Sequence, residues 1–140
     1  MQAKQQIIDK LTQFLKEREE ILFAYIFGSF VSKENYHDID IAVFLRSDFD
    51  KNNYTEFPYG YESKLLSELN ILLKYKIDLL VINNANITIV KKIINNGILL
   101  FSKADKKRIS FENHIRKLYI DAENLRKIKK RYLQRKINNA

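Results

Sequence analysis

The sequence predicts a small α/β domain of the α+β kind: a mixed β-sheet with flanking helices, followed by a long basic amphipathic helix. Three apolar runs of strand length predict buried strands, and segments with helical spacing precede or separate them. The chain has 140 residues, 46% of them hydrophobic, which suffices to bury the core of one domain. We divide it into a core at residues 1–102 and a C-terminal helix at residues 103–140 that packs on this core.

The first half of the chain is predicted to form one helix followed by two strands. Apolar residues recur at helical spacing through residues 3–20, which predicts a helix packed on the sheet. The runs Ile21–Phe27 and Ile39–Leu45 are continuously apolar, as central strands covered on both faces are. Turn-forming residues then fill the stretch from Arg46 to Tyr61, where we expect a loop.

The second half continues the alternation of helices and strands. Helical spacing returns at residues 62–75 and is followed by the apolar run Ile77–Ile82, a third strand. A short helix is expected at residues 87–95, ended by Asn96-Gly97, and a last short strand at residues 98–101. From Ser110, as N-cap, one long helix is predicted. Its apolar stripe comprises Phe111, Ile115, Leu118, Ala122, Leu125, Ile128 and Tyr132.

Two aspartates, Asp38 and Asp40, open the second strand at alternate positions. Residues two apart on a strand project from the same face, so the two carboxylates can converge on one point. Flanked by apolar residues, these like charges resist burial unless a cation or hydrogen bonds compensate. Mg²⁺ takes oxygen ligands and commonly binds through one or two carboxylates plus the phosphates of a substrate. The pair therefore predicts a magnesium site.

Three further residues would complete such a site. Gly28 ends the first strand and lets a ligand approach the backbone, while Ser29 offers a hydroxyl and an N–H where a turn or short helix begins. Asp78 opens the third strand and supplies another carboxylate. Three such carboxylates can hold two metal ions roughly 3.5–4 Å apart for phosphoryl or nucleotidyl transfer. Asp78 is then the expected proton acceptor.

Gly-Ser, a loop, Asp-x-Asp and a lone later aspartate together resemble the nucleotidyltransferase superfamily of DNA polymerase beta. Over about the first hundred residues the chain is most similar to its minimal nucleotidyltransferases, specifically the MntA-like antitoxins that pair with HEPN-domain toxins. The resemblance implies a polymerase-beta-type nucleotidyltransferase fold in which Gly28 and Ser29 hold the triphosphate. It also implies that Asp38 and Asp40 ligate both magnesium ions. Asp78 would ligate one of them and activate the acceptor hydroxyl.

The loop after Gly28-Ser29 departs from the family pattern at one position. Members often carry an arginine where this chain has Ser32, and Lys33 can supply the missing charge to the nucleotide phosphates. His37 lies beside Asp38, but its side chain is expected on the opposite face of the strand, so we interpret it as structural.

The loop of residues 46–61 is expected to border this site. Its aromatic side chains either stack on a base or contact a protein partner, or they cover the edge of the sheet. These aromatic residues are Phe49, Tyr54, Phe57, Tyr59 and Tyr61.

The positive charge is concentrated in the C-terminal helix. Residues 1–102 carry 12 Lys and Arg against 13 Asp and Glu, whereas residues 103–140 carry 13 against 4. This density of cations suggests an acidic protein surface or nucleic acid as partner, and a basic helix alone does not separate the two.

Composition excludes other classes. The chain has no cysteine, so it has neither disulfides nor thiolate metal ligands. It begins with an amphipathic pattern instead of an apolar signal core, and no run reaches the length of a membrane span, so we expect a cytoplasmic protein.

The resemblance implies an antitoxin enzyme. It would transfer AMP from ATP, with Mg²⁺, to a tyrosine hydroxyl of a cognate HEPN ribonuclease toxin and so neutralise it. Two alternatives remain: a binding module that blocks the toxin by contact or binds nucleic acid through its basic helix, and a nucleotidyltransferase that acts on a small molecule.

Overall fold

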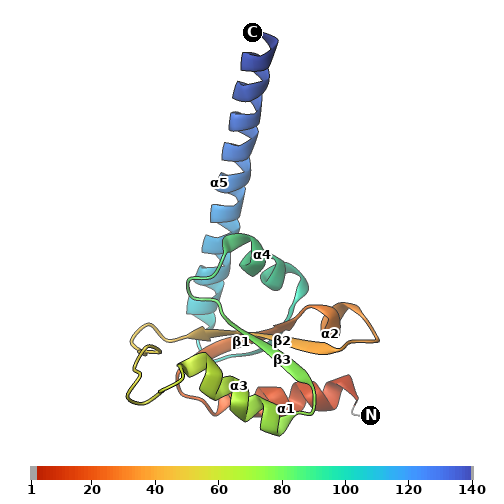
Figure 1. Cartoon of the computed structure of the whole chain (residues 1–140), viewed down its shortest axis with the longest axis vertical. Helices are drawn as coiled ribbons and strands as arrows, with labels where there is room; N and C mark the ends of the chain where they lie inside the picture. The colour runs from red at the N-terminus through yellow and green to blue at the C-terminus, as the bar shows by residue number, and fades with distance from the viewer. Residues whose placement is uncertain (1–2, 140) are drawn as a thin grey trace.

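The computed structural model of the chain describes residues 3–139 as a four-stranded sheet between two helical layers, with a long helix leaving one side (Figure 1). In chain order the elements are α1 (Lys4–Lys16), β1 (Ile21–Phe27), α2 (Ser29–Ser32), β2 (Asp38–Leu45), α3 (Tyr61–Leu72), β3 (Lys76–Val81), α4 (Ile87–Asn96), β4 (Ile98–Ser102) and α5 (Asp105–Asn138). The predicted fold class is confirmed.

The sheet is mixed because β2 pairs antiparallel with β1 and parallel with β3. The strand order is β3-β2-β1-β4, and β4 is also antiparallel to β1. As a result, β1 ends where the other three strands begin. We call this end of the sheet, marked by Phe27, Asp40 and Asp78, the aspartate end.

Helices α1 and α3 cover one face of the sheet (Figure 1). Helix α1 buries Ile7, Leu11 and Leu15, which lie on one side of the helix because they are spaced by four. It ends at Lys16, before the expected residue 20, since the chain turns there: the Ile21 N–H donates to the Arg18 carbonyl at 3.1 Å as β1 begins.

Helix α4 and the first turns of α5 cover the other face (Figure 1). Phe23 of β1 and Phe44 of β2 stack with ring centroids 4.5 Å apart, and Phe111 of α5 packs 4.9 Å from Phe44. The Tyr25 hydroxyl donates a hydrogen bond to Glu112 Oε1 at 2.6 Å. These contacts fasten the start of α5 to the sheet.

Replacing Tyr25 by phenylalanine is expected to lower the free energy of unfolding by about 1–2 kcal/mol, because it removes a buried hydrogen bond to a carboxylate. Urea unfolding of the purified protein measures this. Tyr132→Phe, which changes an exposed tyrosine of α5, is the control and should be neutral. Equal stability of both variants would contradict the anchoring role of Tyr25.

Helix α5 begins at Asp105, so the prediction that Ser110 is its N-cap was wrong. Arg108 pairs with Asp105 at 3.7 Å and with Glu112 at 3.1 Å, and these pairs one turn apart favour a helix that runs through position 110. Although α5 has 34 residues, neither it nor any other helix within residues 3–139 has the apolar length needed to cross a membrane.

The distal part of α5, residues 123–138, leaves the core (Figure 1). Its apolar residues are exposed: Leu125 by 53%, Ile128 by 61% and Tyr132 by 61%. The expectation that the whole apolar stripe packs on the core is therefore wrong beyond Ala122. The stripe extends further along the chain than the sheet layer that could cover it.

Candidate active site

Asp40 of β2 and Asp78 of β3 occupy the same register position on neighbouring parallel strands. Directly paired residues project from the same face of a sheet. Here it is the face covered by α4 and α5, because Ala42 and Leu80, two positions further along, contact that layer. Asp38 stands two residues before Asp40 and shares the face. The three predicted carboxylates thus project from one face at the aspartate end.

The alternating pattern of β2 fixes this arrangement. Ile39, Ile41 and Val43 are fully buried against α1 and α3, so the intervening residues must face the other way. A register slip by one residue would move these three to the face of α4 and α5 and turn the aspartates into the core under α1 and α3. The cost of that exchange holds Asp40 opposite Asp78.

The carboxylates repel one another. Burial raises the pKa of Asp40 above its usual range, and the charge of Asp78, a side-chain hydrogen bond with Asp78 and the charge of Asp38 raise it further. Within residues 3–139, no group of three acidic or histidine side chains lies close enough together to coordinate one metal ion. The gathering of all three carboxylates around cations therefore stays a prediction.

Replacing Asp78 by asparagine is expected to raise the free energy of unfolding by up to about 1 kcal/mol near neutral pH without divalent cations, because it removes a like-charge pair. The raised pKa of Asp40 gives the sign of the pH dependence. The folded protein binds the proton of the Asp40 carboxyl more tightly than the unfolded chain does. Protonation of Asp40 therefore stabilises the fold, and this stabilisation is lost as pH rises through the pKa of Asp40 in the folded protein.

Urea unfolding of wild type and Asp78→Asn in a chelator, at about pH 4 and about pH 7, measures this effect. The advantage of the variant should grow with pH. A variant that is less stable than wild type at the higher pH would show that the two carboxylates do not repel in the folded state.

Gly28 forms the corner between β1 and α2 and lies against the Asp40 side chain. Its backbone, at φ +75° and ψ −151°, is one that residues with a Cβ rarely adopt. A Cβ placed there would lie 2.0 Å from Asp40 Oδ2. Ser29 follows as the first residue of α2, and the Ser32 hydroxyl donates to the Gly28 carbonyl at 3.3 Å. The predicted Gly-Ser corner thus adjoins a predicted carboxylate.

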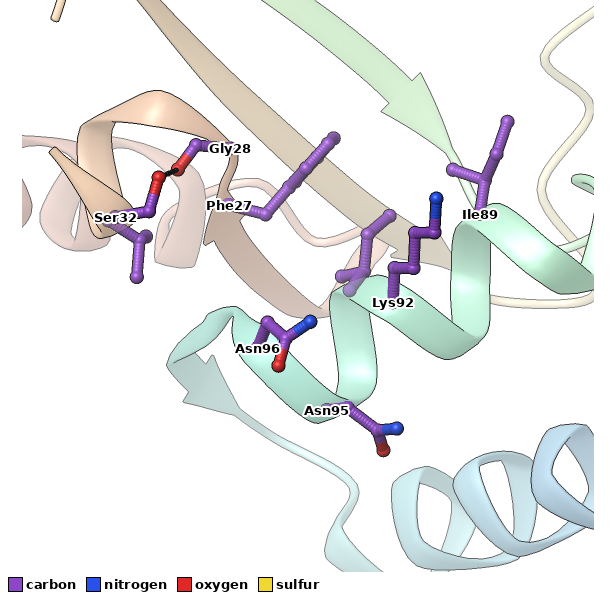
Figure 2. Close-up of a pocket in the computed structure, with 9 residues that line it drawn as sticks. Phe27, Gly28, Ser32, Ile89, Lys92, Asn95 and Asn96 are labelled. Carbon is purple, nitrogen blue, oxygen red and sulfur yellow. Dashed lines mark hydrogen bonds between the residues drawn. The ribbon is translucent and has the colours of Figure 1, made fainter.

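A pocket of about 720 Å³ opens beside this corner (Figure 2). One wall is the Gly28 corner with α2, and the other is α4 from Ile89 to Asn96, which packs over the same face as the carboxylates. The lining residues are Phe27, Gly28, Val31, Ser32, Ile89, Lys92, Ile93, Asn95 and Asn96.

Sequence reasoning missed the polar residues of the α4 wall, Lys92, Asn95 and Asn96. It recognised this helix but used only its apolar positions and its glycine stop. No local signal marks these three residues, because only the packing of α4 on the sheet brings them opposite Gly28.

Lys33 and His37 lie outside the pocket lining and are exposed. The Lys33 backbone carbonyl accepts a hydrogen bond from Lys4 Nζ at 2.7 Å, which ties the loop after α2 to α1. Lys33 is therefore held near the aspartate end by its backbone, while its side chain extends from the surface.

The expectation that the aromatic loop borders this site was wrong. Strand β2 carries the chain away from Asp38, so the loop after Leu45 lies at the opposite end of the sheet. Phe49, Phe57 and Tyr61 pack on one another there, with Phe49 and Tyr61 ring centroids 5.0 Å apart. These three residues take the covering role that the sequence left open, whereas Tyr54 and Tyr59 of the same loop are exposed.

A glycine corner set against paired aspartates, at the end of a mixed sheet, defines a nucleotidyltransferase-type fold. The chain matches the family described as "Polymerase beta, Nucleotidyltransferase" over residues 9–106. It belongs to that family, because the match covers more than half of its length. The resemblance seen in the sequence motifs is thereby confirmed.

Relatives and solved structures agree with this assignment. The chain is similar to a protein of Methanocaldococcus jannaschii named "Putative protein adenylyltransferase", with 29% identity over 94 residues that cover 67% of this chain and 90% of that protein. It is also similar in structure to a chain from the complex of a tri-AMPylated Shewanella oneidensis HEPN toxin with an MNT antitoxin. That match has a TM-score of 0.63 and 22% identity, and covers 89% of this chain and 93% of the other.

A second structural match is to a toxin–antitoxin crystal structure with AMP-PNP, an ATP analogue. Its TM-score is 0.61 at 21% identity, and it covers 86% of this chain and 92% of the other. At these identities the structural similarity establishes the fold, which extends over most of both chains.

Proposed function

We propose that this protein is an antitoxin that transfers AMP from ATP to a tyrosine hydroxyl of a cognate HEPN ribonuclease toxin in the cytoplasm. The observation that carries the proposal is the pairing of Asp40 with Asp78 beside the Gly28 corner, in a chain of the polymerase beta nucleotidyltransferase family. The M. jannaschii relative and the AMPylated HEPN complex support the choice of reaction and partner.

The donor set at the aspartate end suits Mg²⁺. Asp38, Asp40 and Asp78 offer only carboxylate oxygens, which are the ligands that hard cations take, and their mutual repulsion is what a bound cation would relieve. When bound, two such ions stabilise the charge on the entering and leaving oxygens of the displacement. Gly28 and Ser29 would hold the triphosphate, and Lys33 is a further cation near this end.

The residues of the chain have a defined part in the chemistry. A tyrosine hydroxyl has a pKa near 10, so it must lose its proton as it attacks the α-phosphorus of ATP. The Asp78 carboxylate accepts that proton, a bond forms between the tyrosine oxygen and the α-phosphorus, and the bond to the leaving pyrophosphate breaks. Asp78 suits this role because it is more exposed than Asp40 and can reach an incoming hydroxyl.

We assign the chemistry to the core of residues 1–102 and the partner contact to the C-terminal helix of residues 103–140. The distal part of α5 carries seven Lys and Arg against one Glu, together with an exposed apolar stripe. The phosphates of a nucleic acid would attract the cations but would leave the apolar stripe exposed. An acidic protein surface with an apolar groove would contact the cations and bury the stripe. This favours a protein partner over nucleic acid.

Reversing charge on distal α5 is expected to weaken binding of the toxin at least about tenfold, because it removes complementary charge from the contact. The variant is Lys127→Glu with Lys130→Glu, and the matched control is Lys10→Glu in α1 with Lys74→Glu in the turn between α3 and β3. Calorimetric titration with the toxin measures it. Unchanged binding would remove α5 from the interface, and loss of salt-sensitive RNA binding instead would identify a nucleic-acid surface.

The decisive test of function is incubation with ATP labelled on its α-phosphate and Mg²⁺, with and without the product of the neighbouring gene as candidate toxin, followed by location of the label. Label on a tyrosine of that partner is the expected result. The family match and the AMP-PNP complex of a structural neighbour favour a nucleotide-using protein over the contact-only alternative. The enzymatic proposal would be overturned if the toxin is neutralised without becoming labelled and if the double variant Asp38→Asn with Asp40→Asn neutralises it as well.

A further inference from the structure

The pocket between the Gly28 corner and α4 adjoins the carboxylates, and its α4 wall has no part in the function proposed above (Figure 2). We propose that Lys92 of α4, on the wall opposite Gly28, binds the phosphates of the nucleoside triphosphate in this pocket. The inference rests on the proposed function for the identity of the ligand. It assigns to α4 a role in substrate binding that sequence reasoning did not give it.

The first reason is charge. A nucleoside triphosphate adds several negative charges to an end of the sheet that already carries three carboxylates, and two Mg²⁺ ions would offset only part of this charge. A protein cation close to the phosphates would therefore strengthen binding. Among the residues that line the pocket, the one with a charged side chain is Lys92. The Gly28 corner contributes backbone groups and hydroxyls, which can accompany a cation but not replace it.

The second reason is that Lys92 is not engaged elsewhere. In the part of the chain that the structure describes, no carboxylate lies within 4.0 Å of its ammonium group. Its neighbour Lys91 differs, because the Lys91 ammonium lies 4.7 Å from the ring centroid of Tyr119 in α5. Two adjacent lysines thus face different surroundings, one the long helix and the other the pocket.

The third reason is that α4 holds Lys92 in a defined place. The Asn86 side chain caps the helix by accepting from the Thr88 N–H at 2.8 Å, and Val90 and Ile93 are buried against the sheet. At the other end, a Cβ on Gly97 would lie 2.6 Å from the Ile93 carbonyl oxygen and 3.1 Å from that of Ile26. This close approach presses the end of α4 against β1.

The rest of the lining suits the remainder of a nucleotide. Phe27, Ile89 and Ile93 offer apolar surface to a base, and Asn95 and Asn96 carry amides that can donate and accept hydrogen bonds (Figure 2). The volume of about 720 Å³ lies within the range of small-molecule pockets, roughly 300–1,000 Å³.

The test compares the affinity of AMP-PNP, with Mg²⁺, for wild type and for Lys92→Gln by calorimetric titration. We expect about tenfold to a hundredfold weaker binding, because a hydrogen-bonded ion contact to phosphate is lost. Adenosine, which has no phosphates, should bind both proteins alike. Lys91→Gln is the matched control and should bind AMP-PNP within about twofold of wild type, because the Lys91 ammonium lies over the Tyr119 ring instead of the pocket. Thermal unfolding of each variant verifies the fold.

Three outcomes would overturn the inference: wild-type affinity in Lys92→Gln, an equal loss in Lys91→Gln, or no binding of AMP-PNP to wild type. The readout is independent of the toxin. If Lys92→Gln binds AMP-PNP weakly but no protein becomes labelled, the inference stands and the proposed acceptor falls. If the toxin is labelled and Lys92→Gln binds normally, the inference alone falls.

Discussion

Asp40→Asn is expected to reduce AMP transfer about a thousandfold while the fold is retained. Asp40 is central to the carboxylate group, because it pairs in register with Asp78, follows Asp38 by two residues and touches the Gly28 corner. Asparagine keeps the shape but removes the charge that would hold divalent cations beside the transferred phosphate. Losing such preorganised charge stabilisation typically costs factors of this size.

Single-turnover transfer of labelled AMP to the toxin measures the effect, with thermal unfolding as the check on folding. Asp9→Asn, an exposed aspartate on α1 across the sheet, is the control and should transfer AMP at the wild-type rate. Transfer by Asp40→Asn within a factor of about ten of wild type would place the chemistry elsewhere in the molecule.

Gly28→Ala is expected to lower the free energy of unfolding by about 1–3 kcal/mol and the rate of AMP transfer at least about a hundredfold. The backbone at φ +75° disfavours any residue with a Cβ, and the new methyl would meet Asp40 Oδ2 at 2.0 Å. Relief of that clash must move either the corner or the carboxylate, and a displacement of this kind near reacting atoms is costly.

Gly60→Ala separates the two effects. Gly60 also has a positive φ, +93°, but a Cβ there would find no atom within 4 Å. It should therefore share the loss of stability in urea unfolding and keep the wild-type rate of transfer. Similar loss of activity in both variants would mean that backbone strain alone, and not displacement of Asp40, disturbs the site.

The elements were predictable from the sequence where local pattern determines them. The runs that became β1 and β2 are continuously apolar because both faces of the sheet are covered there, and the edge strand β3 is covered in part. Asp40 and Asp78 stand out because an acid opens an apolar strand. The pairing of these two aspartates follows from the parallel register of β2 and β3. The sequence shows only that both acids open strands.

What the sequence could not give depends on how elements pack in three dimensions. Lys92 lies in the pocket only because α4 folds back over the aspartate end, and nothing near position 92 marks it. The apolar stripe of α5 predicts burial equally well along its length, although the sheet covers it only near Phe111 and Ile115. Helical spacing reports that a face is apolar but not what covers it.

The length of α5 has a kinetic consequence for the reaction. At 34 residues the helix is about 50 Å long, and it departs from the same side of the sheet as the aspartates. A toxin held by the distal turns is tethered on the side from which the carboxylates project. The acceptor tyrosine would then meet the bound nucleotide within one complex. Its effective concentration would depend on the length of α5 and not on the concentration of free toxin.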